Sequence, residues 1–347
     1  MRRHLQIVGN GVAAAACARL LAERGIEYHH ESFNRPGLAA ILLGSQTQSL
    51  LSSVFGIQDL SLDCHGIRHR IVKWGISQSP IQLPHQGLVI SEQRLLKSLW
   101  QIIPKSLDID TIQKQLDENL FSVKTIHYAE SISESLIFGD RTATVIEVAM
   151  RPHYDVHACA IESLTTGWLF LLPASENRAT LISVSTFATL EEQLAQSLVI
   201  GNAIDSIIPV EKPASFSCAP RITLPLGNTS FLSCGSAAMS FDPVCGEGAG
   251  NALREAFLAS AVIQAMLHNE PVPALIAHYS SRLLSGFQRH LELCREFYAT
   301  GGNGEFWRSE LAMLEVGISR IRQILATMPP GAYRLKGLLL ERLAADV

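Results

Sequence analysis

The first third of the chain alternates between short apolar runs and longer segments whose apolar residues share one helical face. Residues 4–8 predict a buried strand, 12–23 an Ala- and Leu-rich helix that ends at Gly25, and 27–31 a second strand. This order and length are typical of a βαβ unit. The same patterns predict further strands and helices, namely strands at 65–74 and 88–90 and helices at 45–55 and 91–100.

Between residues 118 and 187 the pattern changes to short apolar segments separated by turn residues, which is typical of an antiparallel sheet. The expected strands are 121–127, 136–138, 143–150, 157–163, 168–172 and 179–187. A helix at 190–200 and an apolar strand at 231–234 follow. The remainder is expected to be helical, at 249–268, 273–299, 305–326 and 332–344.

Composition changes this picture mainly by exclusion. The 347 residues are 47% hydrophobic and 17% charged with a net charge of −4, which fits a globular protein with a sizeable core. No cluster of Lys and Arg indicates a nucleic-acid partner. No apolar run approaches the roughly 18 residues of a membrane span, and a leader peptide is rejected because Glu23 and Arg24 directly follow the first apolar stretch. The cytoplasm is therefore the expected location.

The cysteines favour neither a disulfide framework nor a metal site. There are seven, at wide spacings and without a CxxC pair. We expect most of them to be buried as small apolar residues, and we predict no bound metal.

Gly9, Gly11 and Ala14 form a G-x-G-x-x-A pattern between the first predicted strand and its helix. The first glycine permits the tight turn, the second lets a diphosphate approach the backbone, and the small third residue lets helix and strand pack closely. Ala13 and Ala14 lie in the first helical turn, whose free N–H groups favour an anion. This pattern predicts dinucleotide binding without separating FAD from NAD(P).

Two further residues complete this predicted nucleotide site. Glu31 ends the second strand about 20 residues after the glycines, where a carboxylate accepts the ribose hydroxyls. Arg35 follows it, either as a contact of the diphosphate or as a residue of a surface loop.

The segment 231–251 reads as a strand, a Gly turn, a Pro-centred loop and a Gly-rich helix start. It resembles the second FAD motif of the aromatic-hydroxylase and tryptophan-halogenase superfamily of flavoproteins. The resemblance implies that Pro243 stands beside the reactive face of the flavin and that the N–H groups near Gly246 face its pyrimidine oxygen. The cofactor-binding residues that it implies in this segment are Gly235, Asp242, Gly246, Gly248, Ala249 and Asn251.

This resemblance extends along the chain and implies its architecture. The segments 167–173 and 294–307 also resemble halogenase motifs. The implied fold is α/β, with an FAD-binding Rossmann-like parallel sheet, an inserted antiparallel substrate sheet and a helical C-terminus. The expected domains are an FAD-binding domain from 1–115 and 225–270, a substrate domain from 116–224, and a helical segment from 271–347.

The chain departs from the family pattern at three places. Ser236 replaces the usual Asp, so hydrogen bonds to the ribityl chain are expected to be weaker or differently made. Phe170 replaces the second Trp of the halogenase motif. No lysine lies at the halogenase distance before Trp74, and Lys73 is expected on the opposite face of its strand. Halogenation is therefore disfavoured.

Three residues are candidates for a role in catalysis. Pro243 is implied by the resemblance. Cys245 lies within the flavin loop and would contact either the ring or a substrate, unless it is a small packing residue. Trp168 would line the substrate pocket, unless it is a core residue of its strand.

These observations predict an FAD-dependent monooxygenase that hydroxylates an electron-rich, indole-like ring. Electrons would come from NAD(P)H or from a flavin reductase. The compact tail resembles the subgroup that matures cysteine tryptophylquinone amino-acid oxidases, in which the substrate is a Trp side chain of a precursor oxidase polypeptide. A flavin-dependent halogenase and a flavin-dependent reductase or dehydrogenase of a small molecule remain the alternatives.

Overall fold

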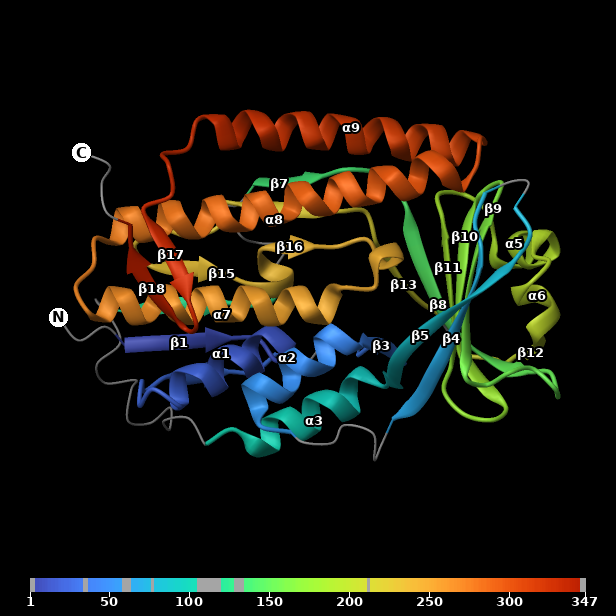
Figure 1. Ribbon diagram of the computed structural model, residues 1–347, viewed down its shortest axis with the longest axis horizontal. Coiled ribbons are helices and arrows are strands. Elements are labelled where there is room, and N and C mark those ends of the chain that lie inside the picture. The colour runs from blue at the N-terminus through green and yellow to red at the C-terminus, as the bar shows by residue number, and fades with distance from the viewer. Residues whose placement is uncertain are drawn as a thin grey trace.

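The computed structural model describes residues 4–33, 37–57, 64–75, 78–104, 120–127, 134–210 and 213–343. A small parallel sheet with its helices occupies one end of the molecule, and a larger mixed sheet stands at the other (Figure 1). Two long C-terminal helices run side by side along both parts.

The small sheet, sheet A, is parallel and has the order β15-β6-β1-β2. Its strands are β1 (His4–Val8), β2 (His29–Glu31), β6 (Leu120–Lys124) and β15 (Phe231–Ser233). The helix α1 (Val12–Ala22) packs against α7 (Gly248–Leu267), and its alanines are buried, since small side chains allow the close approach. The predicted βαβ unit is confirmed.

The strand β6 corrects one expectation. The sequence placed residues 121–127 at the start of the antiparallel run, yet β6 pairs in parallel with both β1 and β15. Alternating apolar residues identify a half-buried strand but not the strand beside it.

Sheet B is a nine-stranded mixed sheet with the order β12-β8-β11-β10-β9-β4-β5-β3, and β13 also pairs with β8. Its only parallel pairing among the described strands joins β4 to β9. The strands are β3 (Ile41–Gly44), β4 (His65–Lys73), β5 (Ile81–Ile90), β8 (Thr142–Met150), β9 (Ala158–Leu164), β10 (Gly167–Pro173), β11 (Arg178–Ser185), β12 (Ile204–Ile207) and β13 (Ala214–Ser217).

Sheet B therefore differs from the expected purely antiparallel insertion. Its strands β3, β4 and β5 come from the segment that the sequence assigned to the FAD-binding part. The helices α2 (Ser45–Phe55) and α3 (Glu92–Ile102) lie in the same segment. The division into three domains remains a prediction. One continuous sheet, sheet B, contains strands from both sides of the first predicted boundary.

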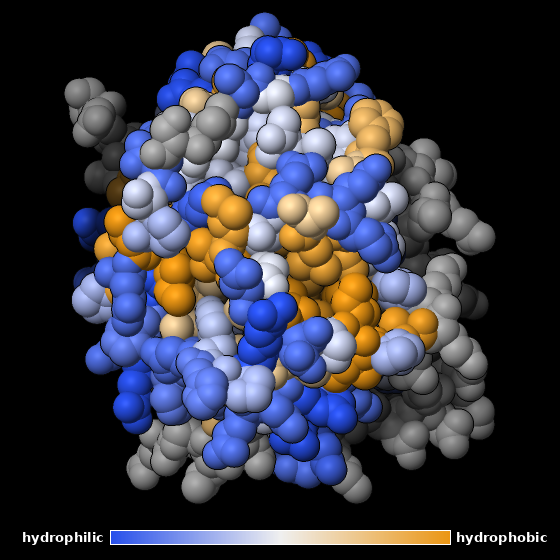
Figure 2. All heavy atoms as spheres, turned by 90° about the vertical axis from the view of Figure 1, so that its right-hand side faces the viewer, coloured by the Kyte–Doolittle hydropathy of each residue, from blue (hydrophilic) through white to orange (hydrophobic). Residues whose placement is uncertain are grey.

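Smaller elements complete the fold. Sheet C has the order β16-β14-β7, built from β7 (Glu134–Ile137), β14 (Arg221–Leu224) and β16 (Met239–Ser240). The short helices α5 (Leu190–Gln196) and α6 (Ile200–Ala203) lie at the far end of sheet B (Figure 1). Figure 2 shows this end of the molecule, where apolar side chains gather among polar ones.

The helices α8 (Val272–Gly301) and α9 (Glu305–Ala326) tie both sheets together. Tyr279 of α8 donates its hydroxyl to the carbonyl of Ser233 in sheet A at 2.6 Å. Trp307 of α9 donates to the carbonyl of Leu164 in sheet B at 2.7 Å. Among the described residues no helix combines the length and the apolar character needed to cross a membrane.

The expected helix at 332–344 is wrong. Over the described residues this tail forms an antiparallel hairpin of β17 (Tyr333–Lys336) and β18 (Leu339–Arg342). Gly337 adopts a φ of +59° in the two-residue turn, a conformation that glycine accepts without strain. The Leu-rich sequence suggested a helix because its apolar spacing fits either period over so short a stretch.

Candidate functional site

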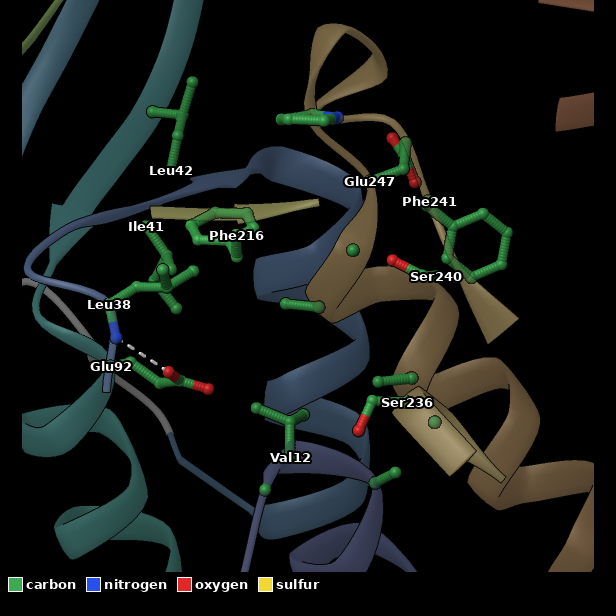
Figure 3. Close-up of a pocket in the computed structure, with 18 of the residues that line it drawn as sticks. Val12, Leu38, Ile41, Leu42, Glu92, Phe216, Ser236, Ser240, Phe241 and Glu247 are labelled. Atoms are coloured by element: carbon green, nitrogen blue, oxygen red, sulfur yellow. Dashed lines mark hydrogen bonds between the residues drawn. The ribbon is translucent and has the colours of Figure 1, made fainter. Parts of the chain in front are cut away.

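A cavity of about 360 Å³ lies where the two glycine-rich segments meet sheet B (Figure 3). Figure 3 shows Leu38, Ile41 and Phe216 on one side of the cavity and Ser236 and Ser240 on the opposite side. Sheet B contributes an apolar wall, made of Val145, Phe170, Leu172, Ile182 and Phe216. The space therefore has one backbone-rich polar side and one apolar side.

The first glycine segment is braced for close backbone approach. Gly9 has a φ of +116°, and a Cβ atom there would overlap the Oγ1 atom of Thr125. Its amide donates to the Glu31 carbonyl at 2.9 Å. His30 lies 2.8 Å from the Gly9 carbonyl through Nε2 and stacks on Trp100. Only glycine fits this turn.

The N-terminus of α1 opens onto the cavity. Gly11 is its N-cap and offers no side chain to the free N–H groups of the first turn. Gly11 and Ala13 line the cavity, while Ala14 is fully buried beneath them. An anion placed here would meet unsatisfied N–H groups and the positive end of the helix dipole.

The predicted ribose carboxylate lies beside the Gly9 turn but is not among the residues that line this cavity. Glu31 ends β2 and accepts a hydrogen bond from Gln6 Nε2 at 2.8 Å. Arg35 lies outside the described residues.

The second glycine segment touches the first. After β15 it forms the 3₁₀ turns η2 (Gly235–Ala237) and η3 (Pro243–Cys245) before α7. Gly235 has a φ of +57°, and a Cβ there would lie 2.8 Å from the Cβ of Ala13. Segments more than 200 residues apart thus share one wall, as the sequence predicted.

Several predicted flavin-loop residues line the cavity together. They are Pro243, Gly246, Gly248 and Ala249, and Gly246 adopts the left-handed conformation with a φ of +64°. The N-terminus of α7 has no side-chain cap, so its amides remain available. Asn251 does not line the cavity. Its Oδ1 atom accepts a hydrogen bond from Arg254 at 3.1 Å.

Asp242 holds the loop from inside. It is almost fully buried, and its Oδ1 atom accepts from the amide of Val244 at 2.8 Å, which caps η3. Its Oδ2 atom accepts from Arg141 Nε at 2.6 Å and from the Tyr298 hydroxyl at 2.9 Å. Asp242 lines the cavity, but protein donors occupy both of its carboxylate oxygens.

Arg141 is the centre of this buried network, and the sequence did not point to it. Its guanidinium also donates to Glu310 of α9 and lies 4.5 Å from the centroid of the Tyr298 ring. Burial would lower the pKa of Arg141, but Tyr298, Asp242 and Glu310 together raise it well above its usual value. The arginine therefore stays charged in a fully buried position.

Cys245 points toward α8 rather than lining the cavity. Its Sγ atom lies 3.7 Å from Cys294 Sγ, which in turn lies 3.3 Å from His290 Nε2. The hydrogen bond from Cys294 lowers the pKa of Cys245 to about 6, although burial opposes the shift. Burial raises the pKa of Cys294 well above its usual value.

These three residues are of the kind that binds soft metal ions, and their ligand atoms lie within 4.8 Å of one another. No CxxC spacing marks such a cluster, because its ligands come from two elements, η3 and α8. His290 Nε2 already accepts the amide of Asp242 at 2.9 Å. Its lone pair is therefore engaged, and the cluster is a thiol pair next to a histidine.

Trp168 does not line the cavity. Its side chain is fully buried, and its Nε1 atom donates to the Tyr298 hydroxyl at 3.1 Å. It therefore touches the Arg141–Asp242 network rather than the open space. Phe170, two residues further along β10, does reach the cavity.

Two buried carboxyl groups at the cavity escaped the sequence analysis. Glu92 of α3 accepts the Leu38 amide at 2.9 Å (Figure 3), and Glu255 of α7 accepts the Gly235 amide at 2.6 Å. Phe216 also lines the cavity from β13. Each lies in an ordinary helix or strand pattern, and only the fold brings it to the site.

No family model and no curated protein matches the chain, but solved structures do. The peptidyl tryptophan dihydroxylase QhpG, essential for tryptophylquinone cofactor biogenesis, is 19% identical with a TM-score of 0.75, over 99% of this chain and 86% of its own. The myxobacterial chondrochloren halogenase CndH, an FAD-dependent halogenase, is 14% identical with a TM-score of 0.73, over 93% of this chain and 90% of its own.

A third similar structure is 2,6-dihydroxypyridine-3-hydroxylase from Arthrobacter nicotinovorans. It is 12% identical with a TM-score of 0.63, over 88% of this chain and 95% of its own. The expected fold resemblance to aromatic hydroxylases and flavin-dependent halogenases is therefore confirmed, and it extends over nearly the whole chain.

Proposed function

We propose that the chain binds FAD in this cavity and acts as a monooxygenase on an electron-rich aromatic ring. The observation that carries the proposal is the meeting of Gly11–Ala13 with Gly235 and Gly248 around one cavity with an apolar far wall. The similarity in fold to two aromatic hydroxylases and an FAD-dependent halogenase supports the choice of chemistry.

The residues present fit FAD. The N-terminus of α1 would hold the diphosphate, and the free amides of Gly248 and Ala249 would stabilise negative charge on the reduced ring. Pro243 would lie against the ring, and the Arg141–Asp242 pair would hold its loop in place. Reduced FAD would supply two electrons to dioxygen, so that one oxygen atom enters the substrate and the other leaves as water.

The apolar wall is suited to an aromatic substrate. Phe170 and Phe216 supply aromatic faces on the sheet B side. No lysine is among the described residues that line the cavity. Lys73 lies 3.3 Å from the buried carboxylate of Glu162 instead. This placement favours hydroxylation over halogenation.

We further propose that the aromatic ring is a Trp side chain of a precursor polypeptide, as in maturation of a tryptophylquinone oxidase. The likeness to QhpG, a peptidyl tryptophan dihydroxylase, supports this choice. Phe187, 93% exposed between β11 and α5, and Leu198, 64% exposed just after α5, offer apolar contact to a partner. NAD(P)H or a flavin reductase would supply the electrons, and the cytoplasm is the proposed location.

The test begins with FAD reconstitution, followed by reduction and exposure to isotopically labelled dioxygen in the presence of a Trp-containing peptide. We expect one labelled oxygen atom per hydroxylation in the product. Product formed in the absence of oxygen would indicate a reductase or dehydrogenase instead. A product that forms only with chloride would indicate a halogenase. Failure of the protein to bind FAD would overturn the whole proposal.

A further inference from the structure

Glu255 is a buried carboxyl group with one oxygen unused. It lies on α7 and is 5% exposed, and it lines the cavity with Gly235 and Ser236. Its Oε2 atom accepts the Gly235 amide at 2.6 Å, whereas Oε1 has no hydrogen-bond partner among the described residues. A buried polar oxygen without a partner is unfavourable, so its position at a cavity wall points to a ligand.

The residue beside Glu255 in this turn, Ser236, differs from that of the resembled flavoproteins. The resembled flavoproteins carry an Asp after the glycine of this turn, and this chain carries Ser236. The Ser236 hydroxyl donates to the Thr125 carbonyl at 3.2 Å, so its hydrogen is already used. Glu255 brings a carboxyl to the same turn from a different element.

The protonation state of Glu255 determines what it offers. Burial raises its pKa to about 8, and the hydrogen bond from the Gly235 amide opposes the shift. At neutral pH the group is therefore mostly protonated. Because Oε2 accepts the amide, the proton sits on Oε1, which becomes a hydrogen-bond donor.

Within the part of the chain that the structure describes, the groups around Glu255 supply no counter-charge. Those that interact with it electrostatically are Cys234 at the end of β15 and Tyr279 of α8, with Cys17 of α1 next to both. The pKa of Cys234 is raised well above its usual value by its hydrogen bond with Cys17 and by burial, and burial also raises that of Tyr279. Cys234 and Tyr279 therefore stay neutral together with Glu255 near pH 7.

We infer that Glu255 is a cofactor-binding residue whose protonated carboxyl donates from Oε1 to a ribityl or phosphate oxygen of FAD. The inference rests on the proposed FAD site and takes over the position that the family gives to the missing Asp. Ionisation would remove the donor and place a negative charge beside the diphosphate. FAD affinity then falls as pH rises through the pKa of about 8, by up to about tenfold per pH unit.

The experiment measures the dissociation constant of FAD by quenching of flavin fluorescence between neutral and alkaline pH. We expect wild-type affinity to fall above the pKa of about 8. Glu255→Gln keeps a donor and an acceptor without ionising, so its affinity stays near that of the wild type and does not change with pH. Glu255→Leu lowers the affinity for FAD at least about tenfold. This variant loses both the hydrogen bond from Oε1 to FAD and the hydrogen bond from the Gly235 amide to Oε2.

Glu147→Gln is the control, because this exposed carboxylate of sheet B pairs with Arg178 at 2.8 Å and does not line the cavity. It should keep the wild-type pH profile, and circular dichroism checks that each variant is folded. A Gln variant with the wild-type pH profile, or a folded Leu variant with unchanged affinity, overturns the role of Glu255 while FAD binding stands. A wild-type protein that binds no FAD at any pH overturns the proposed function itself.

Discussion

Arg141 Nε lies 2.6 Å from Asp242 Oδ2, and both side chains are completely buried. The pair joins the start of β8 in sheet B to the loop that leads into η3. Glu310 of α9 binds the same guanidinium, so three distant segments meet on one charge. This arginine therefore ties the loop before η3 to both sheet B and α9.

Replacing Arg141 should lower the free energy of unfolding of the protein. Arg141→Met leaves Asp242 and Glu310 without their cation, and we expect a loss of about 3–5 kcal/mol in the free energy of unfolding. Urea unfolding followed by circular dichroism measures it. Arg178→Met is the control, since that exposed pair with Glu147 should contribute about 0–1 kcal/mol. Equal effects of the two substitutions would contradict a central role for Arg141.

The turn at Gly9 should tolerate no side chain. Gly9→Ala places a Cβ against Thr125 in a backbone conformation that alanine avoids, so we expect FAD to bind about tenfold more weakly or worse. Equilibrium titration with FAD measures the change. Gly44→Ala serves as the control, because a Cβ there meets no atom and its φ of −67° is ordinary. Unchanged FAD binding by Gly9→Ala would argue against the nucleotide site at this turn.

Cys245 should react as a thiolate at neutral pH. Its pKa of about 6 predicts an alkylation rate with a midpoint near that pH, whereas an ordinary thiol has a pKa of about 8.5. Since the folded pKa is the lower one, ionisation adds stability that is fully present above the unfolded pKa and is lost as pH falls through about 6. Iodoacetamide labelling with mapping of the modified peptide gives the midpoint.

Two variants separate the causes of this reactivity. Cys294→Ser weakens the hydrogen bond to Cys245 and should move the midpoint to higher pH. Cys218→Ser changes a buried cysteine outside the cluster and should leave the midpoint in place. The explanation fails if Cys245 reacts only under alkaline conditions.

The apolar wall of sheet B should determine substrate binding and not cofactor binding. Phe216→Ala removes one aromatic face from the cavity, and we expect KM for an indole-containing substrate to rise about tenfold. The dissociation constant of FAD should stay unchanged. Phe187→Ala, whose side chain lies outside the cavity, should leave KM for a free indole unchanged. A substrate KM insensitive to Phe216 would place the aromatic ring elsewhere.

The sequence predicted those features that depend on residues close together along the chain. Apolar spacing located the long helices and the strands from β1 to β11 except β3, and the glycine patterns located both loops of the cavity, because backbone geometry there admits little else. It did not predict β3 or the short strands β12, β13, β14 and β16. It could not assign β6 to the parallel sheet, since alternation does not specify the neighbouring strand. The hairpin of β17 and β18 was missed because Leu-rich segments of that length fit two periods.

The network behind the loop was beyond prediction for a different reason. Arg141 lies 101 residues from Asp242 and 169 from Glu310 along the chain. No spacing rule links such residues, and an isolated arginine beside a strand is usually solvated. Glu255 was hidden in the same way, inside a helix that resembles any other.

The parallel pairing of β4 with β9 limits how this protein could be recombined. A chimera that exchanged only residues 134–224 for those of a relative would place the new strand β9 beside the host strand β4. The foreign half of the sheet would then have to match a register fixed by the host. Transfer of the whole of sheet B between proteins of this fold therefore requires two separate segments to be exchanged together, and evolution of a new sheet B meets the same constraint.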